Sequence, residues 1–196
     1  MLGTSGNLSV LITGHMDVRT YEPMKDFEFL ITASGKDKGE LTEEDFILVD
    51  EEGQPQGIIP TKPSAETLLH AAIYKQTNAK AVFHVHTTNS ALLSMYNPPI
   101  PHSPIPPLFF SGLEMLKGLG FKTHDVKVTI PVIENSQDMK YLAEIVPGYI
   151  NEDIPGLLLK GHGIYAWGQS TYEAKRHVEI FEFLFEYRVK EKLINR

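Results

Sequence analysis

The sequence predicts a single α/β domain spanning residues 1–196. Segments with the apolar alternation of strands take turns with segments that carry the apolar stripe of helices, and this order is typical of α/β folds. No internal repeat, low-complexity segment or linker divides the chain. A chain of 196 residues is long enough to bury a substantial core in one domain.

The predicted strands are short apolar runs bounded by turn-forming residues. They are expected at residues 7–13, 28–32, 46–49, 79–86, 126–133, 157–160 and 164–167. The segment 79–86 alternates cleanly, so that Val82, His84 and His86 share one face of the strand.

The predicted helices follow residues that cap helix N-termini. Ser64 is expected to cap a helix over 65–76, and Ser170 to form a capping box with Glu173 at the start of the last helix. Two further helices are expected over 89–96 and 136–146, and short helical turns at 42–45 and 114–117. The proline-rich stretch 97–107 is expected to be a functional loop.

The composition excludes several classes of function. With 25 acidic and 18 basic residues, and a formal charge of −7, the chain lacks the basic surface of a nucleic-acid-binding protein. Its apolar runs are far shorter than the roughly 20 residues that span a bilayer, and no signal peptide is evident. Because the chain has no cysteine, a metal would rest on histidines and carboxylates. We expect a cytoplasmic protein with neither nucleic-acid nor membrane partners.

Three histidines are candidate metal ligands. His84 and His86 are two residues apart in a predicted strand, so both imidazoles project from one face and can reach one cation. His162 lies between two glycines where an apolar strand ends, and glycines there allow a tight turn and close approach. The alternative is a pair of surface histidines and an ordinary turn histidine. Together the three would form the open ligand set of a catalytic zinc or a similar divalent ion.

Three turns rich in small hydroxyl residues and glycine suit an anion. They lie at residues 4–7, 32–35 and 62–65, the last at the predicted start of a helix. Backbone N–H groups in such turns and at helix N-termini bind phosphate, although the same residues are also common in turns without a ligand. Glu66, in the first turn of that helix, and Glu114, after the proline-rich stretch, are candidate proton-transfer groups.

These motifs together resemble the class II aldolase/adducin family. The resemblance rests on five segments in chain order: residues 5–9, 32–39, 62–67, 84–87 and 160–163. Within the family, residues 114–118 and 161–168 are most similar to those of members that dehydrate a ketose phosphate. Family members carry a helix before the first of these segments, and none precedes Met1 here, so we expect that the natural N-terminal segment is absent from this sequence.

The resemblance implies a fold and an assembly. The fold would be a three-layer α/β/α domain around a mostly antiparallel central sheet, and the assembly a homotetramer with active sites near subunit interfaces. One Zn²⁺ per subunit would be held by His84, His86 and His162. The substrate phosphate would be bound by residues of the three turns: Ser5, Gly6, Asn7, Ser34, Gly35 and Ser64.

The implied function is the zinc-dependent dehydration of 5-methylthioribulose 1-phosphate to 2,3-diketo-5-methylthiopentyl 1-phosphate in methionine salvage. Dehydratases of the family use a carboxylate at the position of Glu114 as acid/base, and a raised pKa of Glu114 is expected for this role. Aldolases of the family instead use the carboxylate at the position of Glu66, sometimes as an extra metal ligand. This sequence has both, so the division of roles stays open.

Three alternatives stand beside this interpretation. A sugar-phosphate aldolase or 4-epimerase, acting on a fuculose- or ribulose-type substrate, would share the metal and the chemistry but break a different bond. A non-catalytic interaction module of the adducin type predicts loss of the three histidines, all of which are present. A structural zinc site predicts a fourth protein ligand and no open position.

Overall fold

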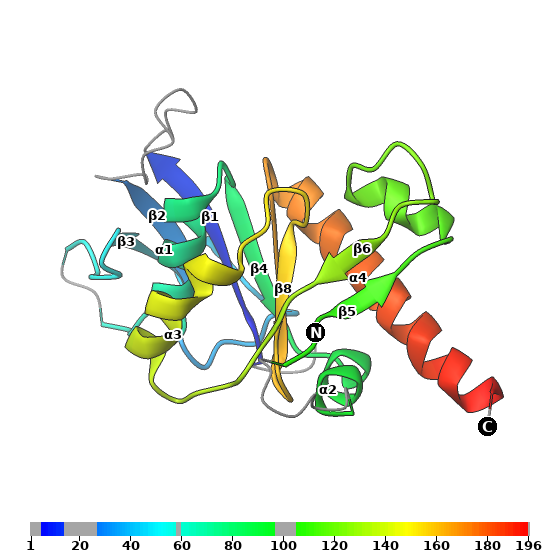
Figure 1. The fold of residues 1–196 in the computed structure, drawn as a ribbon. Helices are drawn as coiled ribbons and strands as arrows, with labels where there is room; N and C mark the ends of the chain where they lie inside the picture. The colour runs from blue at the N-terminus through cyan, green and yellow to red at the C-terminus, as the bar shows by residue number, and fades with distance from the viewer. Residues whose placement is uncertain (1–4, 14–26, 58–59, 97–104, 196) are drawn as a thin grey trace.

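The protein is described by a computed structural model that covers residues 5–13, 27–57, 60–96 and 105–195 (Figure 1). Within these residues a seven-stranded sheet has the order β3-β2-β1-β4-β9-β8-β7, and β5 and β6 form a separate pair. Every neighbouring pair in the large sheet is antiparallel except β7 and β8. The bounds are β1 Asn7–Thr13, β2 Glu28–Thr32, β3 Phe46–Asp50, β4 Ala81–Val85, β5 Leu108–Phe110, β6 Val128–Ile130, β7 Val132–Ile133, β8 Gly156–Leu159 and β9 Gly163–Gly168.

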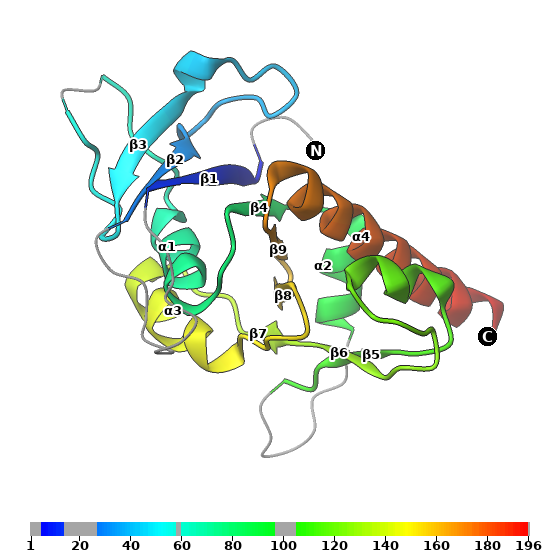
Figure 2. The same cartoon turned by 90° about the horizontal axis from the view of Figure 1, so that it is seen from above.

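Helices cover both faces of the large sheet, which Figure 2 shows edge-on. The α-helices are α1 Thr67–Gln76, α2 Thr88–Met95, α3 Met139–Ile145 and α4 Thr171–Ile194, and the short 3₁₀ helices are η1 Glu43–Asp45, η2 Glu114–Leu119 and η3 Val146–Tyr149. One core cluster joins the sheet to α1 and α3, and a second joins its other face to α2, α4, η2 and the β5–β6 pair. The α/β/α layers and the mostly antiparallel sheet are therefore as expected.

Two predicted elements differ from the structure. The expected strand 126–133 is divided at Pro131, which has no N–H for a ladder, so that β6 pairs with β5 while β7 joins the large sheet. The helix expected from residue 65 begins at Thr67, because Ser64 Oγ accepts the N–H of Glu66 and holds the chain outside the helix for two more residues.

The ends of two other segments also differ. Ser170 caps α4 as expected by accepting the N–H of Glu173, but the Glu173 carboxylate accepts the N–H of Gln169 rather than closing a box on Ser170. The strand β5 was not predicted; it begins at Leu108, directly after the predicted proline-rich loop 97–107. Residues 97–104 of that loop lie outside the described residues. Among the helices in the described part of the chain, none has the length and apolarity needed to cross a bilayer.

Candidate metal centre and active site

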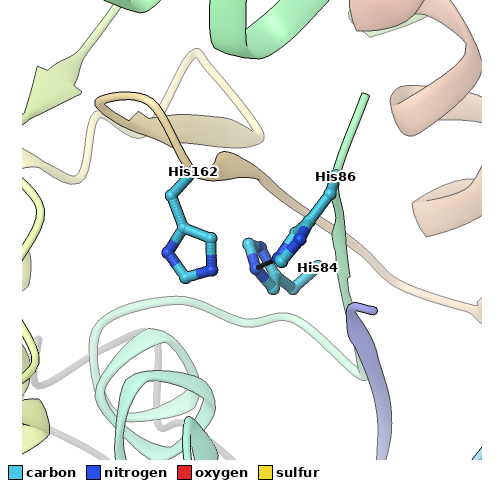
Figure 3. Close-up of side chains that lie close together, drawn as sticks. All are labelled: His84, His86 and His162. Atoms are coloured by element: carbon cyan, nitrogen blue, oxygen red, sulfur yellow. Dashed lines mark hydrogen bonds between the residues drawn. The ribbon is translucent and has the colours of Figure 1, made fainter. Parts of the chain in front are cut away.

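The end of β4 carries two of the candidate ligands, and the β8–β9 turn carries the third. His84 is fully buried in β4, His86 follows the last residue of that strand, and His162 lies in the turn. Because β4 pairs with β9, this turn lies beside the end of β4, so segments almost 80 residues apart in the sequence meet. The three side chains point toward one another (Figure 3).

The three imidazoles form a compact group. The Nε2 atoms of His84 and His86 are 2.8 Å apart. The ring centroids lie 4.7 Å apart for His84 and His86, 4.8 Å for His84 and His162, and 4.5 Å for His86 and His162. One ligand nitrogen from each ring falls within 4.8 Å of the others, which is the spacing of a group that could hold one metal ion.

The protonation states of His84 and His86 fit the binding of a divalent cation. His84 Nδ1 lies 3.1 Å from the carbonyl oxygen of Ile164 and donates to it, which leaves the Nε2 lone pair directed toward the other two rings. Burial, and then the neighbouring histidines, hold the pKa of His84 well below its usual value. Burial also lowers the pKa of His86 to about 4. Neutral imidazoles are the form that ligates metals, and imidazole ligands suit zinc, iron, cobalt and related ions.

Three glycines let the backbone approach this group. Gly161 has a φ of +65°, in the left-handed region, so the turn that carries His162 is tight. A Cβ on Gly163 would lie 2.4 Å from the carbonyl oxygen of Val85 and 2.9 Å from the rings of His84 and His86. A Cβ on Gly6 would lie 2.4 Å from the carbonyl oxygen of His84. The expectation that glycines beside His162 permit close approach is confirmed.

Glu66 lies against two of the three histidines. Its Oε1 is 3.2 Å from His162 Nε2, and its Oε2 is 3.4 Å from His84 Nε2. The carboxylate comes from the N-cap position of α1, and only 12% of its side chain is exposed. The structure therefore brings one of the two predicted catalytic carboxylates to the metal-binding group.

Two residues of this site were missed from the sequence. The ring of Tyr165 stacks on His84 with centroids 4.1 Å apart and planes at 19°. Burial, and then the charge of Glu66, raise the pKa of Tyr165 well above its usual value, so its hydroxyl stays protonated. The second residue is His70, which is buried and which Asn7 connects to Glu66. Since Glu66 and His70 are four residues apart at the start of one helix, helical spacing was the available signal.

The three candidate phosphate turns meet at the same end of the sheet. Ser34 N–H donates to the carbonyl of Lys62, and Ala33 pairs with Pro63, so the second and third turns lie side by side. The N–H of Leu8 donates to the Thr32 hydroxyl, which brings the first turn, containing Ser5 and Gly6, next to them. Ser34 and Gly35 are exposed, and Ser64 is half-buried. The side chain of Asn7, by contrast, is buried and bonded within the protein.

Glu114 lies elsewhere. In Figure 1, η2 is the light green helix at the upper right, at the opposite end of the molecule from α2, which follows His86. The Glu114 side chain is 68% exposed and pairs with Lys117 Nζ at 2.7 Å and His124 Nδ1 at 3.1 Å. Lys117, with a smaller effect from His124, lowers the pKa of Glu114, so the raised pKa expected of this carboxyl is wrong for the single chain. The structure does not bring Glu114 to the histidines of its own chain.

The fold and the histidine group define a class of α/β/α proteins with a candidate site for one metal ion at one end of the central sheet. The sequence model of the family described as Class II Aldolase and Adducin N-terminal domain matches residues 1–189, and the chain belongs to this family.

Two curated relatives and one solved structure illustrate the similarity. The chain is 44% identical to a methylthioribulose-1-phosphate dehydratase of Geobacillus kaustophilus over 98% of this chain and 85% of that protein. It is 45% identical to a protein of the same name from Persephonella marina, over 94% of this chain and 79% of that protein. An L-fuculose-1-phosphate aldolase structure from Thermus thermophilus superposes with a TM-score of 0.63 at 27% identity, over 98% of this chain and 88% of that one. The relatives' names agree with the dehydratase function that the resemblance implied.

Proposed function

We propose that this protein is a metal-dependent hydro-lyase that converts 5-methylthioribulose 1-phosphate to 2,3-diketo-5-methylthiopentyl 1-phosphate, a step of methionine salvage. The observation that carries the proposal is the meeting of three imidazoles and one carboxylate, Glu66, beside turns suited to phosphate. The near full-length similarity to dehydratases of that name supports this substrate.

His84, His86 and His162 would hold one Zn²⁺ per subunit. The chemistry that a bound zinc supplies is Lewis-acid polarisation of the ketose carbonyl, which acidifies the adjacent C–H. Glu66 contacts His84 and His162, and it would exchange protons with the substrate there.

The three turns would bind the substrate phosphate. Ser5, Gly6, Ser34, Gly35 and Ser64 would present backbone N–H groups and hydroxyls to its oxygens. Because Asn7 uses its side-chain amide within the protein, its part in phosphate binding would be limited to its backbone. Fixing the phosphate would position the ketose for reaction and so remove part of the barrier.

The dehydration needs two proton transfers. Glu66 would accept the proton from C3, the C–H electrons would form the C3=C4 bond, and the C4–O bond would break. An acid must then protonate the departing hydroxyl, which leaves as water, and the resulting enol tautomerises to the diketone. Glu114 would be this acid, supplied by a neighbouring copy of the chain. Burial against the neighbour would remove Glu114 from water and raise its pKa, as that role requires.

The proposed action of Glu114 in a neighbouring copy requires that the chains assemble, and we propose that the assembly is a homotetramer. Because η2, which begins at Glu114, lies away from the histidines of its own chain, Glu114 would reach a histidine group only if the group belonged to another copy. In a cyclic oligomer, one type of contact between subunits is repeated, so each interface would bring Glu114 of one copy to the histidine group of the next. Light scattering on the purified protein measures the assembly, and a monomer with full activity would contradict it. The cytoplasmic location stays a prediction.

The test of the function is incubation of purified protein with methylthioribulose 1-phosphate, with the diketone followed over time. We expect turnover that a chelator abolishes and added Zn²⁺ restores, together with one metal per chain by elemental analysis. Turnover that survives complete metal removal would refute the proposal.

The second candidate is retro-aldol cleavage of a fuculose-type phosphate. The contact of Glu66 with His84 and His162 favours it, because family aldolases use the carboxylate at that position. The same preparation assayed with fuculose 1-phosphate separates the two reactions. Cleavage to an aldehyde and a triose phosphate, without diketone formation from the methylthio substrate, would select the aldolase.

A further inference from the structure

A line of buried polar side chains lies behind Glu66. Asn7, Ser9, His70 and Tyr74 are at most 3% exposed. Ser9 and Asn7 come from β1, and His70 and Tyr74 from α1, so the line passes through the interface between the sheet and its covering helix. Tyr74 packs there against Phe29, with ring centroids 5.2 Å apart. Polar groups in such a core are costly unless each is hydrogen-bonded.

The members form one continuous chain of hydrogen bonds. Tyr74 Oη and Ser9 Oγ are 2.8 Å apart, and Ser9 Oγ lies 2.6 Å from His70 Nδ1. On the other side of the imidazole, His70 Nε2 lies 2.5 Å from Asn7 Oδ1. Asn7 Nδ2 then lies 2.5 Å from Glu66 Oε2, where the chain reaches the metal-binding group.

The direction of every bond follows from its ends. Glu66 as a carboxylate only accepts, so Asn7 presents its NH₂ to it and its oxygen to His70. His70 Nε2 must therefore carry a proton and donate. Burial lowers the pKa of His70 to about 3, so the ring is neutral and its Nδ1 accepts from the Ser9 hydroxyl. Ser9 then accepts from the Tyr74 hydroxyl. Each group thus fixes the orientation of the next.

We infer that Asn7 and His70 are positioning residues, which hold the Glu66 carboxylate as a hydrogen-bond acceptor facing His84 and His162. This inference rests on the proposed function of Glu66 and deepens it. It also gives the Asn7 side chain a different role from the phosphate ligand that the resemblance implied, since both ends of its amide are engaged inside the protein. Among the residues that the structure describes, Glu66 is the member of this chain of bonds that contacts the proposed metal ligands.

The test compares His70→Leu with His70→Gln. Leucine removes both bonds of the ring, whereas a glutamine amide retains a donor for Asn7. Without His70 the Asn7 amide is no longer oriented toward the charged Glu66, so we expect kcat of His70→Leu to fall by up to about 10- to 100-fold, the range for loss of that one buried hydrogen bond, with KM within about twofold. His70→Gln should recover most of the lost kcat. A phosphate-binding role for Asn7 would instead raise KM in Asn7→Ala and leave kcat nearly unchanged.

The matched control is His177→Leu. His177 is also a buried histidine, but it lies in α4, which covers the opposite face of the sheet from α1. Its Nδ1 donates to the carbonyl of Trp167, and it makes no described contact with Glu66. We expect His177→Leu to keep the parental kcat. Equal kcat losses in the two leucine variants would show a general packing effect and overturn the inference. If His70→Leu does not fold, Ser9→Ala decides, because it removes the donor to His70 Nδ1 and the acceptor of the Tyr74 hydroxyl but leaves the imidazole in place; an unchanged kcat there would overturn the inference.

A second readout does not depend on turnover. Cobalt bound in place of the native metal has visible bands that respond to groups at the centre. The bands of His70→Leu should change as those of Glu66→Gln do, and those of His177→Leu should match the parent. This result with an inactive parent would mean that the substrate assignment is wrong and the positioning chain is right. Unchanged bands in both Glu66→Gln and His70→Leu would overturn the inference.

Discussion

The two candidate catalytic carboxylates, Glu66 and Glu114, occupy opposite environments at opposite ends of the sheet. Glu66 is almost buried, contacts two imidazoles and accepts a hydrogen bond from Asn7. Glu114 is exposed and pairs only with Lys117 and His124 among the described residues. One is held in place by the interior of its own chain, and the other is free to meet a neighbour.

The comparison separates two kinds of catalytic group. A carboxylate that is fixed by buried partners is ready to act within its own subunit. A carboxylate on the surface, with a pKa lowered by a lysine, is unsuited to act as an acid until another surface covers it. The proposed site would therefore combine a preformed half with a half that assembly completes.

Removal of a histidine should have the largest effect, because it removes one of the three proposed metal ligands. In His162→Ala we expect loss of bound metal and a decrease of at least about a thousandfold in turnover, the scale of lost Lewis-acid activation. Elemental analysis and diketone formation measure the two effects. A variant that keeps both metal and activity would place the reacting centre elsewhere.

Glu66→Gln tests the preformed half. Turnover should fall about 10²- to 10⁴-fold, as for loss of a proton-transfer group, while the three histidines still bind metal. The measurement is kcat alongside metal content. Full activity in this variant would leave Glu114 as the only carboxylate of the reaction.

Mixing two inactive variants tests the half that assembly completes. Glu114→Gln supplies intact histidines and His162→Ala supplies an intact Glu114. If the two act across an interface, subunits exchanged in equal amounts should restore about a quarter of the parental activity, since one site in four combines both intact groups. Mixed without subunit exchange, the same variants serve as the control. No recovery after verified exchange would contradict action between copies.

The smallest effect is expected for the stability of Glu114→Gln. Because the residue is exposed in the single chain, the thermal midpoint of the dissociated subunit should stay within about 2 °C of the dissociated parent by calorimetry. The lowered pKa of Glu114 in the single chain means that its ion pair contributes to stability above the ordinary value of 4.5, and that this contribution is lost as the pH falls further. Any difference between the two proteins should therefore vanish in acid. A large loss of stability at neutral pH would show that Glu114 supports the fold.

Local patterns accounted for much of the fold and of the metal-binding group. The two-residue repeat of a strand placed His84 and His86 together, and the glycines around His162 indicated a turn that other groups approach. The capping serines located α1 and α4 to within two residues. Pro131 broke a predicted strand because a missing N–H outweighed the apolar pattern around it.

Contacts between distant segments could not be predicted in the same way. Asn7 reaches His70 and Glu66 only because β1 lies beneath α1, which no spacing in the sequence encodes. Glu66 and Glu114 both begin or precede short helical segments, and their sequence surroundings do not reveal which is buried. Their difference arises from tertiary packing, since η2 lies against α4 whereas Glu66 lies against His84 of β4.

The close contacts of Gly6 and Gly163 have a consequence for redesign. A Cβ on Gly6, just before β1, or on Gly163, in β9, would collide with the carbonyl of His84 or Val85, so the backbone packs closely against the ligand-bearing segment on both edges of β4. These backbone contacts fix the segment without using its side chains. Aspartate or glutamine could therefore replace His84 or His86 on the same backbone support, which makes this strand end a scaffold for exchanging one metal for another.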